Sequence, residues 1–181
     1  KKINKYDINL IKDSVYKLIS ISADDDNLYT ATGFVFKNRS DKSFIITNAH
    51  FCKTTDGVFL MQNSEDYLDG SAIVAEVEYT VEEKDLCIAS TDVMTEPLKL
   101  SFENVKFSEE LKSIGAPEGN YPMFVNLHFS TYVPSGIVTD YFSGVKFNRQ
   151  PFFVSGLIEQ GQSGSPVLNK NNEVVGIIFA K

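Results

Sequence analysis

The sequence is poor in the residues that would tie it to a membrane, to nucleic acid or to a disulfide framework. It contains no tryptophan, two histidines and two cysteines in 181 residues. Its longest apolar run, from Val174 to Ala180, is too short to cross a bilayer. Lys and Arg total 17 against 24 for Asp and Glu, and the net charge of −7 opposes binding along a phosphate backbone. We therefore expect neither a membrane span nor a nucleic-acid partner.

The cysteines and the N-terminus leave the cellular compartment open, cytoplasmic or secreted. Cys52 and Cys87 form no CxxC pair, so the sequence predicts two buried, reduced thiols. The first residues are basic, but no apolar stretch follows them, so we expect no signal peptide. Because the chain begins with Lys1 rather than Met, we expect either a processed product, released from a larger precursor, or an expressed fragment.

What the chain has in quantity is apolar and aromatic residues in short runs. Hydrophobic residues make up 43% of it, enough for a sizeable core at this length. Residues 3–14 show near-helical spacing and predict a short N-terminal helix. The β-branched and aromatic runs that follow are separated by polar turns, as in antiparallel sheets. These runs predict strands at residues 15–21, 30–36, 44–47, 57–61, 71–79, 86–89, 113–114, 124–132, 136–142, 152–154, 167–168 and 174–179.

The predicted strands fall into two groups separated by a polar stretch. Residues 90–110 contain Pro97, lack a clear period and are the best candidate for a linker. We therefore expect an all-β protein of two antiparallel β-barrels. Residues 1–97 would hold the helix and the first barrel, and residues 98–181 the second barrel. The 14 Phe and 8 Tyr without any Trp suit two small cores walled by strands.

The segment Gly161–Pro166, with the sequence GQSGSP, carries the strongest chemical signal. Its glycines allow a tight turn around Ser163 that aims successive N–H groups at one point, as an oxyanion hole requires. Ser163 is the candidate nucleophile, and the N–H groups of Gly161 and Ser163 are the candidate oxyanion donors. Gly, Ser and Pro are also common in ordinary turns, so the nucleophile needs support from a general base elsewhere.

His50 and Asp85 supply that support. His50 ends the apolar run of residues 44–50, which predicts a strand that delivers an imidazole at its end. Asp85 stands where another apolar strand begins, so its carboxylate can be buried against the imidazole and fix its tautomer. The predicted site is a triad of His50, Asp85 and Ser163, with no metal or organic cofactor. The other histidine, His128, alternates with apolar neighbours and is expected to face solvent, with the substrate pocket as the alternative.

Three other kinds of site fit the sequence less well. A zinc site would use His50, Cys52, Cys87 and His128, whose spacing matches no standard framework. An α/β-hydrolase would need glycine where Ser165 stands, and a histidine after the serine, where the sequence has none. A papain-like thiol enzyme would need a nucleophilic context that neither cysteine has.

In these three segments the sequence resembles the trypsin-like (chymotrypsin-fold) serine peptidases. Thr47–His50 resembles their histidine motif, Asp85–Ala89 their aspartate strand, and Gly161–Pro166 their serine loop, in the family's order. Within the family the sequence is most similar to the branches without a disulfide framework. The supporting segments are Ala31–Phe36 and Gly115–Gly119, similar to HtrA-type proteases, and Gly161–Ile177, similar to these and to staphylococcal glutamyl endopeptidases.

The resemblance spans residues 14–181 and implies a polypeptide substrate bound in a cleft between two chymotrypsin-type barrels. By alignment with the family, the six residues before Ser163 line the specificity pocket and Leu157 lies near its floor, which implies an apolar preference before the scissile bond. The last strand is implied to offer its edge to the substrate backbone. The implied substrate-binding residues are Leu157, Ile158, Gln160, Ile178, Phe179 and Ala180.

The chain departs from the family at three points. It stops at Lys181, before the strand that helps to wall the specificity pocket in the family. Ile178 stands where glutamyl endopeptidases carry a histidine, and Lys1 is not the Ile-like N-terminus that activates digestive trypsins. A catalytically silent relative that binds peptides or a protein partner is the alternative function. The serine endopeptidase is favoured because all three triad positions are chemically competent.

Overall fold

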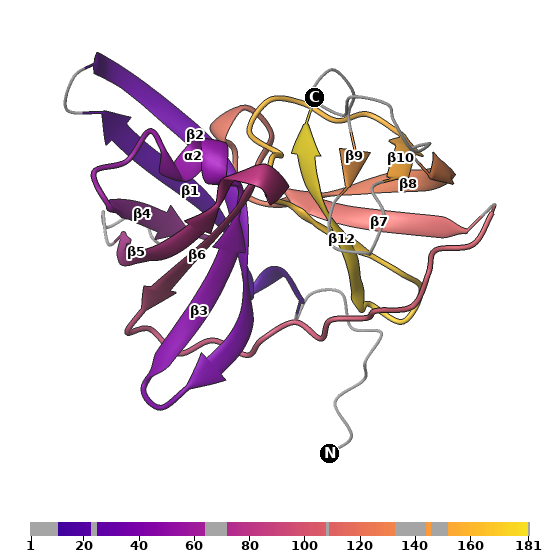
Figure 1. Cartoon of the computed structure of the whole chain (residues 1–181), viewed down its shortest axis with the longest axis horizontal. Coiled ribbons are helices and arrows are strands. Elements are labelled where there is room, and N and C mark those ends of the chain that lie inside the picture. Colours follow the sequence, from indigo (N-terminus) through magenta and orange to yellow (C-terminus); the bar gives the residue numbers. More distant parts are fainter. Residues whose placement is uncertain are drawn as a thin grey trace.

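The computed structural model describes residues 11–22, 25–63, 72–107, 109–132, 144–145 and 152–180, and the structural statements below concern these residues. Their strands form two antiparallel sheets of six strands, and the two sheets lie side by side (Figure 1). Helical segments are short: α2 (Ala49–Cys52) and the 3-10 turns η2 (Glu82–Lys84) and η3 (Pro117–Gly119). Within the described ranges, no helix has the length and apolar character that a membrane span requires.

The first sheet closes into a barrel in the order β1-β2-β3-β6-β5-β4, because β1 pairs with both β2 and β4. Side chains alternate between the two faces of each strand, so every second residue fills the barrel. Leu18, Ile45 and Met61 are fully buried there. The strands are β1 (Val15–Ser22), β2 (Asp25–Arg39), β3 (Lys42–Thr47), β4 (Val58–Gln62), β5 (Ile73–Val81) and β6 (Leu86–Thr91).

The second sheet curls in the order β10-β8-β7-β11-β12-β9 and closes where Phe152 of β10 pairs with Val145 of β9. Leu111, Leu127 and Phe152 are buried in its interior. The strands are β7 (Glu110–Gly115), β8 (Met123–Tyr132), β9 (Gly144–Val145), β10 (Phe152–Ser155), β11 (Pro166–Leu168) and β12 (Val174–Ala180).

The all-β double barrel expected from the sequence is confirmed. Each predicted strand within the described residues overlaps an observed one, while the strand predicted at 136–142 lies outside them. The short strand β9 was not predicted. The helix expected over residues 3–14 lies outside the described residues except for its end, where residues 11 and 12 are helical.

Residues 92–107, which lie between the strands of the two barrels, run along both of them (Figure 1). The Leu98 N–H donates to the carbonyl of Val35 in the first barrel, and the Ser101 N–H donates to that of Val174 in the second. The connection is therefore fixed to both sheets by backbone hydrogen bonds. The domain boundary expected at residues 97/98 falls within it, and the division into two domains stays a prediction.

Strands β2, β3 and β6 are apolar on both faces, because each face packs against a different core. Val35 and Ile45 point into the first barrel, whereas their neighbours Phe34 and Ile46 point toward the second. The contact between the barrels is a buried cluster that draws on both sheets and on their connection. Its members are Ile11, Val15, Phe34, Ile46, Ile88, Leu98, Ile114, Leu168, Val174 and Ile177.

Ile114 tests the contribution of this cluster to stability. Its side chain is fully buried between the barrels. We expect Ile114→Ala to lower the free energy of unfolding by about 2–5 kcal/mol, since it removes buried methyl groups and leaves a cavity. Urea denaturation followed by circular dichroism measures this. Leu28→Ala is the control because Leu28 is 60% exposed, and equal losses in the two variants would contradict the prediction.

Candidate active site

His50 lies on α2, a single helical turn that begins directly after β3. Asn48 occupies the N-cap position, but its amide Nδ2 donates to the backbone carbonyl of Asp85 at 3.1 Å. The Asp85 carboxylate takes over the capping role, since its Oδ1 accepts the His50 N–H at 2.9 Å. A carboxylate is favourable at this end of a helix, where backbone N–H groups are unpaired.

The His50 ring and the Asp85 carboxylate form a direct pair. His50 Nδ1 lies 2.7 Å from Asp85 Oδ2. An ionised carboxylate only accepts hydrogen bonds, so Nδ1 carries the proton and Nε2 is left as the acceptor. Asp85 has the left-handed backbone conformation, with φ at 50°, which Asp tolerates better than most residues. This turn brings its carboxylate to the N-terminus of α2 and against the imidazole.

Ser163 lies in a tight loop between β10 and β11, at residues 160–165. Gly161 and Gly164 have φ values of +94° and +90°, which favour glycine. A Cβ on Gly161 would come within 2.5 Å of the Ala116 carbonyl oxygen, and one on Gly164 would overlap the Thr32 carbonyl. Glycine is therefore needed at both positions for backbone conformation and for space.

Three N–H groups in this loop have no protein acceptor among the described residues: those of Gln160, Gly161 and Ser163. The Gln162 N–H donates to Glu159 O at 3.2 Å, and the Gly164 N–H donates to Ile178 O at 2.7 Å. Within the described part of the chain, the N–H groups of Gly161 and Ser163 make no such bond. Backbone donors of folded proteins are rarely left unpaired. Two of them in one loop can therefore serve an oxyanion.

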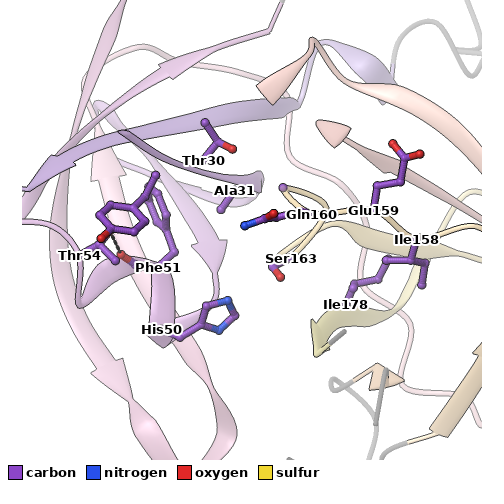
Figure 2. A pocket seen from close by; sticks show the side chains of 12 residues that line it. Thr30, Ala31, His50, Phe51, Thr54, Ile158, Glu159, Gln160, Ser163 and Ile178 are labelled. Carbon is purple, nitrogen blue, oxygen red and sulfur yellow. Dashed lines mark hydrogen bonds between the residues drawn. The ribbon is translucent and has the colours of Figure 1, made fainter. Parts of the chain in front are cut away.

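His50 and Ser163 face each other across a pocket between the barrels (Figure 2). His50 comes from the first barrel and Ser163 from the second. The pocket has a volume of about 420 Å³ and is lined by Tyr29, Thr30, Ala31, His50, Phe51, Thr54, Ile158, Glu159, Gln160, Gly161, Ser163 and Ile178. Among the described residues, the Ser163 hydroxyl has no hydrogen-bond partner. Catalytic hydrogen bonds often tighten only when substrate is bound.

Some of the residues expected to bind substrate line this pocket and others do not. Ile158, Gln160 and Ile178 are part of its wall. Leu157 does not line the pocket, and the residue is 73% exposed. Its expected place at the floor of a pocket is therefore wrong. Gly156 packs directly against Leu127 of the barrel, and the next side chain turns outward. The apolar preference can no longer rest on Leu157.

Ile178, near the end of β12, is bonded on both edges of the strand. The N–H of Ile178 donates to Ser165 O at 3.0 Å. On the other edge β9 pairs with β12, at Ile178 and Ala180. Phe179 is buried and lies outside the wall of the pocket. A substrate-binding role for Phe179 and Ala180 stays a prediction.

His128 lies away from the site. It is exposed on β8, paired with Glu110 of β7 and Ser155 of β10. It lines a different hollow of the second barrel, together with Lys112. The expectation that it faces solvent is confirmed.

A disulfide joins Cys52 and Cys87, so the expectation of two free thiols is wrong. Cys52 ends α2 and Cys87 lies on β6, two residues after Asp85. Pairing of β3 with β6 sets Thr47 opposite Cys87, and the single turn of α2 then returns Cys52 to the same place. The bridge ties the His50 helix to the strand that follows Asp85, and it removes both thiols from any zinc site.

The sequence pattern of one family, the trypsin-like peptidase domain, matches residues 31–177. The chain belongs to this family. The peptidase domain is thus a hydrolase of the trypsin-like serine peptidase type, and its substrate is a polypeptide.

Solved structures show the same fold. The Rv3671c protease from M. tuberculosis in its active form has a TM-score of 0.72 and 21% identity, over 95% of this chain and 72% of that one. Its inactive form has a TM-score of 0.68 and 21% identity, over 95% of this chain and 79% of that one. The HtrA-type protease AlgW with tripeptide has a TM-score of 0.72 and 15% identity, over 94% of this chain and 52% of that one.

Two polar residues that support the site were missed in the sequence. Thr32 is buried and bonds to the Ser163 loop from the first barrel. Gln162 is also buried, and its side-chain Oε1 accepts the Glu159 N–H. Both stand inside motifs used for the family resemblance. The available signal for Thr32 was a polar residue directly before Gly33 and the apolar run Phe34–Phe36.

The disulfide gives a direct test. Removing it with Cys52→Ser and Cys87→Ser together should lower the free energy of unfolding by about 2–4 kcal/mol, because the bridge closes a loop between residues 35 apart. Alkylation of the unfolded, unreduced protein followed by mass spectrometry should find no free thiol. Two alkylated cysteines without reductant would contradict the pairing.

Proposed function

We propose that the peptidase domain cleaves peptide bonds through an acyl-enzyme, with Ser163 as nucleophile, His50 as base and Asp85 as the acid that orients His50. The observation that supports this most directly is the 2.7 Å pair between His50 Nδ1 and Asp85 Oδ2, which faces the Ser163 loop across one pocket. This arrangement supports the roles of Ser163 as nucleophile, His50 as base and Asp85 as the group that orients the base.

In the first half-reaction, Ser163 Oγ attacks the scissile carbonyl carbon and its proton passes to His50 Nε2. The carbonyl oxygen becomes an oxyanion, which accepts hydrogen bonds from the N–H groups of Gly161 and Ser163. The C–N bond then breaks, and His50 gives its proton to the leaving amine. Asp85 stays ionised and stabilises the imidazolium throughout.

In the second half-reaction, water attacks the ester formed on Ser163. His50 takes a proton from this water and returns it to Ser163 Oγ when the acyl group leaves. The oxyanion again lies at the N–H groups of Gly161 and Ser163. The products are two peptides and the free enzyme, and no metal or organic cofactor enters the steps.

We expect the substrate backbone to add to β12 beyond Ile178, on the edge that runs past Gly164 and Ser165 toward Ser163. The side chain before the scissile bond meets mainly apolar groups, Ile158 and Ile178. The Glu159 carboxylate lines the same pocket but points away from Ser163 (Figure 2). We therefore expect an apolar or medium-sized residue at this position, because a buried cation would find no partner.

Labelling with a biotinylated fluorophosphonate tests the nucleophile. The wild-type domain should be labelled on Ser163, and Ser163→Ala should lose labelling and at least about 10³-fold of its casein hydrolysis while keeping its melting temperature. Ser155→Ala is the control, since Ser155 is an exposed serine on β10. Unlabelled wild type that still binds peptides would favour the catalytically silent module instead.

Asp85→Asn tests the orienting acid. The amide oxygen can still accept the His50 N–H, but the amide cannot stabilise an imidazolium and favours the wrong tautomer. We expect kcat to fall by about 10⁴-fold with little change in KM or in melting temperature. Steady-state kinetics on a peptide found by library profiling measures this. Glu82→Gln, an exposed change in the neighbouring turn, should leave kcat unchanged.

A further inference from the structure

Thr32 lies on β2 where the two barrels meet, and it is fully buried. Its N–H donates to the carbonyl of Ser163 at 2.8 Å. Its hydroxyl Oγ1 donates to the carbonyl of Gly161 at 2.9 Å. One residue of the first barrel therefore holds the carbonyls of Gly161 and Ser163, whose own N–H groups bond to no acceptor within the described part of the chain.

The same hydroxyl reaches a second segment of the second barrel. Thr32 Oγ1 accepts the Ala116 N–H at 2.9 Å, in the turn that contains η3. That turn also holds the Ser163 loop directly, since the Glu118 N–H donates to Gln160 O at 2.5 Å. A trans peptide points its C=O and N–H in opposite directions. The bond from Glu118 holds the Gln160 carbonyl toward the turn, so the Gly161 N–H of the same peptide points away from the turn.

Each peptide from residue 160 to residue 164 is thus fixed by a hydrogen bond. The peptide that carries the Ser163 N–H is held because Gln162 O accepts the N–H of Ser165 at 3.0 Å. The peptides after Gly161 and after Ser163 are held by Thr32. Without the Thr32 hydroxyl, the Gly161 carbonyl and the Ala116 N–H would lose a buried partner, which is unfavourable enough to shift the loop.

We propose that Thr32 is a positioning residue for the oxyanion hole. Its hydroxyl locks the turn at Ala116 and the peptides around Gly161 in the orientation in which the Gly161 and Ser163 N–H groups meet the oxyanion. Thr32 lies behind the loop and acts through it. The inference rests on the proposed acyl-enzyme chemistry, because only a reaction that develops negative charge at these N–H groups depends on their orientation.

Thr32→Val is the informative variant, since it keeps the volume and the backbone N–H and removes only the hydroxyl. We expect kcat/KM for a library-derived peptide to fall by about 10- to 100-fold, mostly through kcat, because the donors are displaced rather than removed. Thr32→Ser keeps the hydroxyl and should restore most of kcat. Thr91→Val is the matched control, because Thr91 Oγ1 is a buried hydroxyl of the first barrel that donates to Val74 O at 3.0 Å and does not contact Thr32 or the Ser163 loop.

A peptide boronic acid separates positioning from simple loss of folded protein. Its adduct with Ser163 places an oxygen on boron at the oxyanion position, so its inhibition constant should rise in Thr32→Val by about the factor lost in kcat/KM. Active-site titration corrects each rate for the fraction of folded enzyme. An unchanged kcat per active site in Thr32→Val, equal losses in Thr91→Val, or no recovery in Thr32→Ser would overturn the role of Thr32.

Crystal structures of the wild type and of Thr32→Val measure the positioning without any reaction. The expected result is a rotated peptide at residue 160 or 161 in the variant. The same loop in both structures would overturn the inference even if the domain is an active protease. Conversely, a rotated loop in a domain whose wild type is not labelled by fluorophosphonate would support the positioning role and reject the proposed function.

Discussion

Apolar packing between the two barrels fixes the position of His50 relative to Ser163, because these residues belong to different sheets. Ile46 and Ile114 meet in the cluster that joins the sheets, a short distance along β3 and β7 from the site. Protein interiors are packed densely and resist sliding. His50 and Ser163 lie on separate sheets and can therefore keep one geometry as long as this cluster stays intact.

His50 and Asp85 are organised within the first barrel alone. Asp85 caps the His50 helix, pairs with the imidazole and accepts the Asn48 amide, while the Cys52–Cys87 bridge ties the same helix to β6. This half of the site is preorganised before substrate arrives, so little of the binding energy is needed to orient it.

The nucleophile loop depends on both barrels. Within the second barrel, Gln162 and Ser165 bond inside the loop, and Ile178 holds its end. Thr32 supplies the bonds from the first barrel, at the place where a Cβ on Gly164 would collide with its carbonyl. Because Gly164 lets the loop lie directly against Thr32, the packing of the two barrels also sets the orientation of the loop's N–H groups.

The sequence by itself determined the strands and the candidate triad, since both depend on local patterns. The β-branched and aromatic run of residues 44–47 and the glycines around Ser163 express strand propensity and φ/ψ constraints that act over a few residues. The Cys52–Cys87 bridge, the outward turn of Leu157 and the reach of Thr32 to Gly161 were decided only by the tertiary structure. Each depends on which strands become neighbours and which face meets the other barrel, and such long-range pairings leave no periodic trace in the chain.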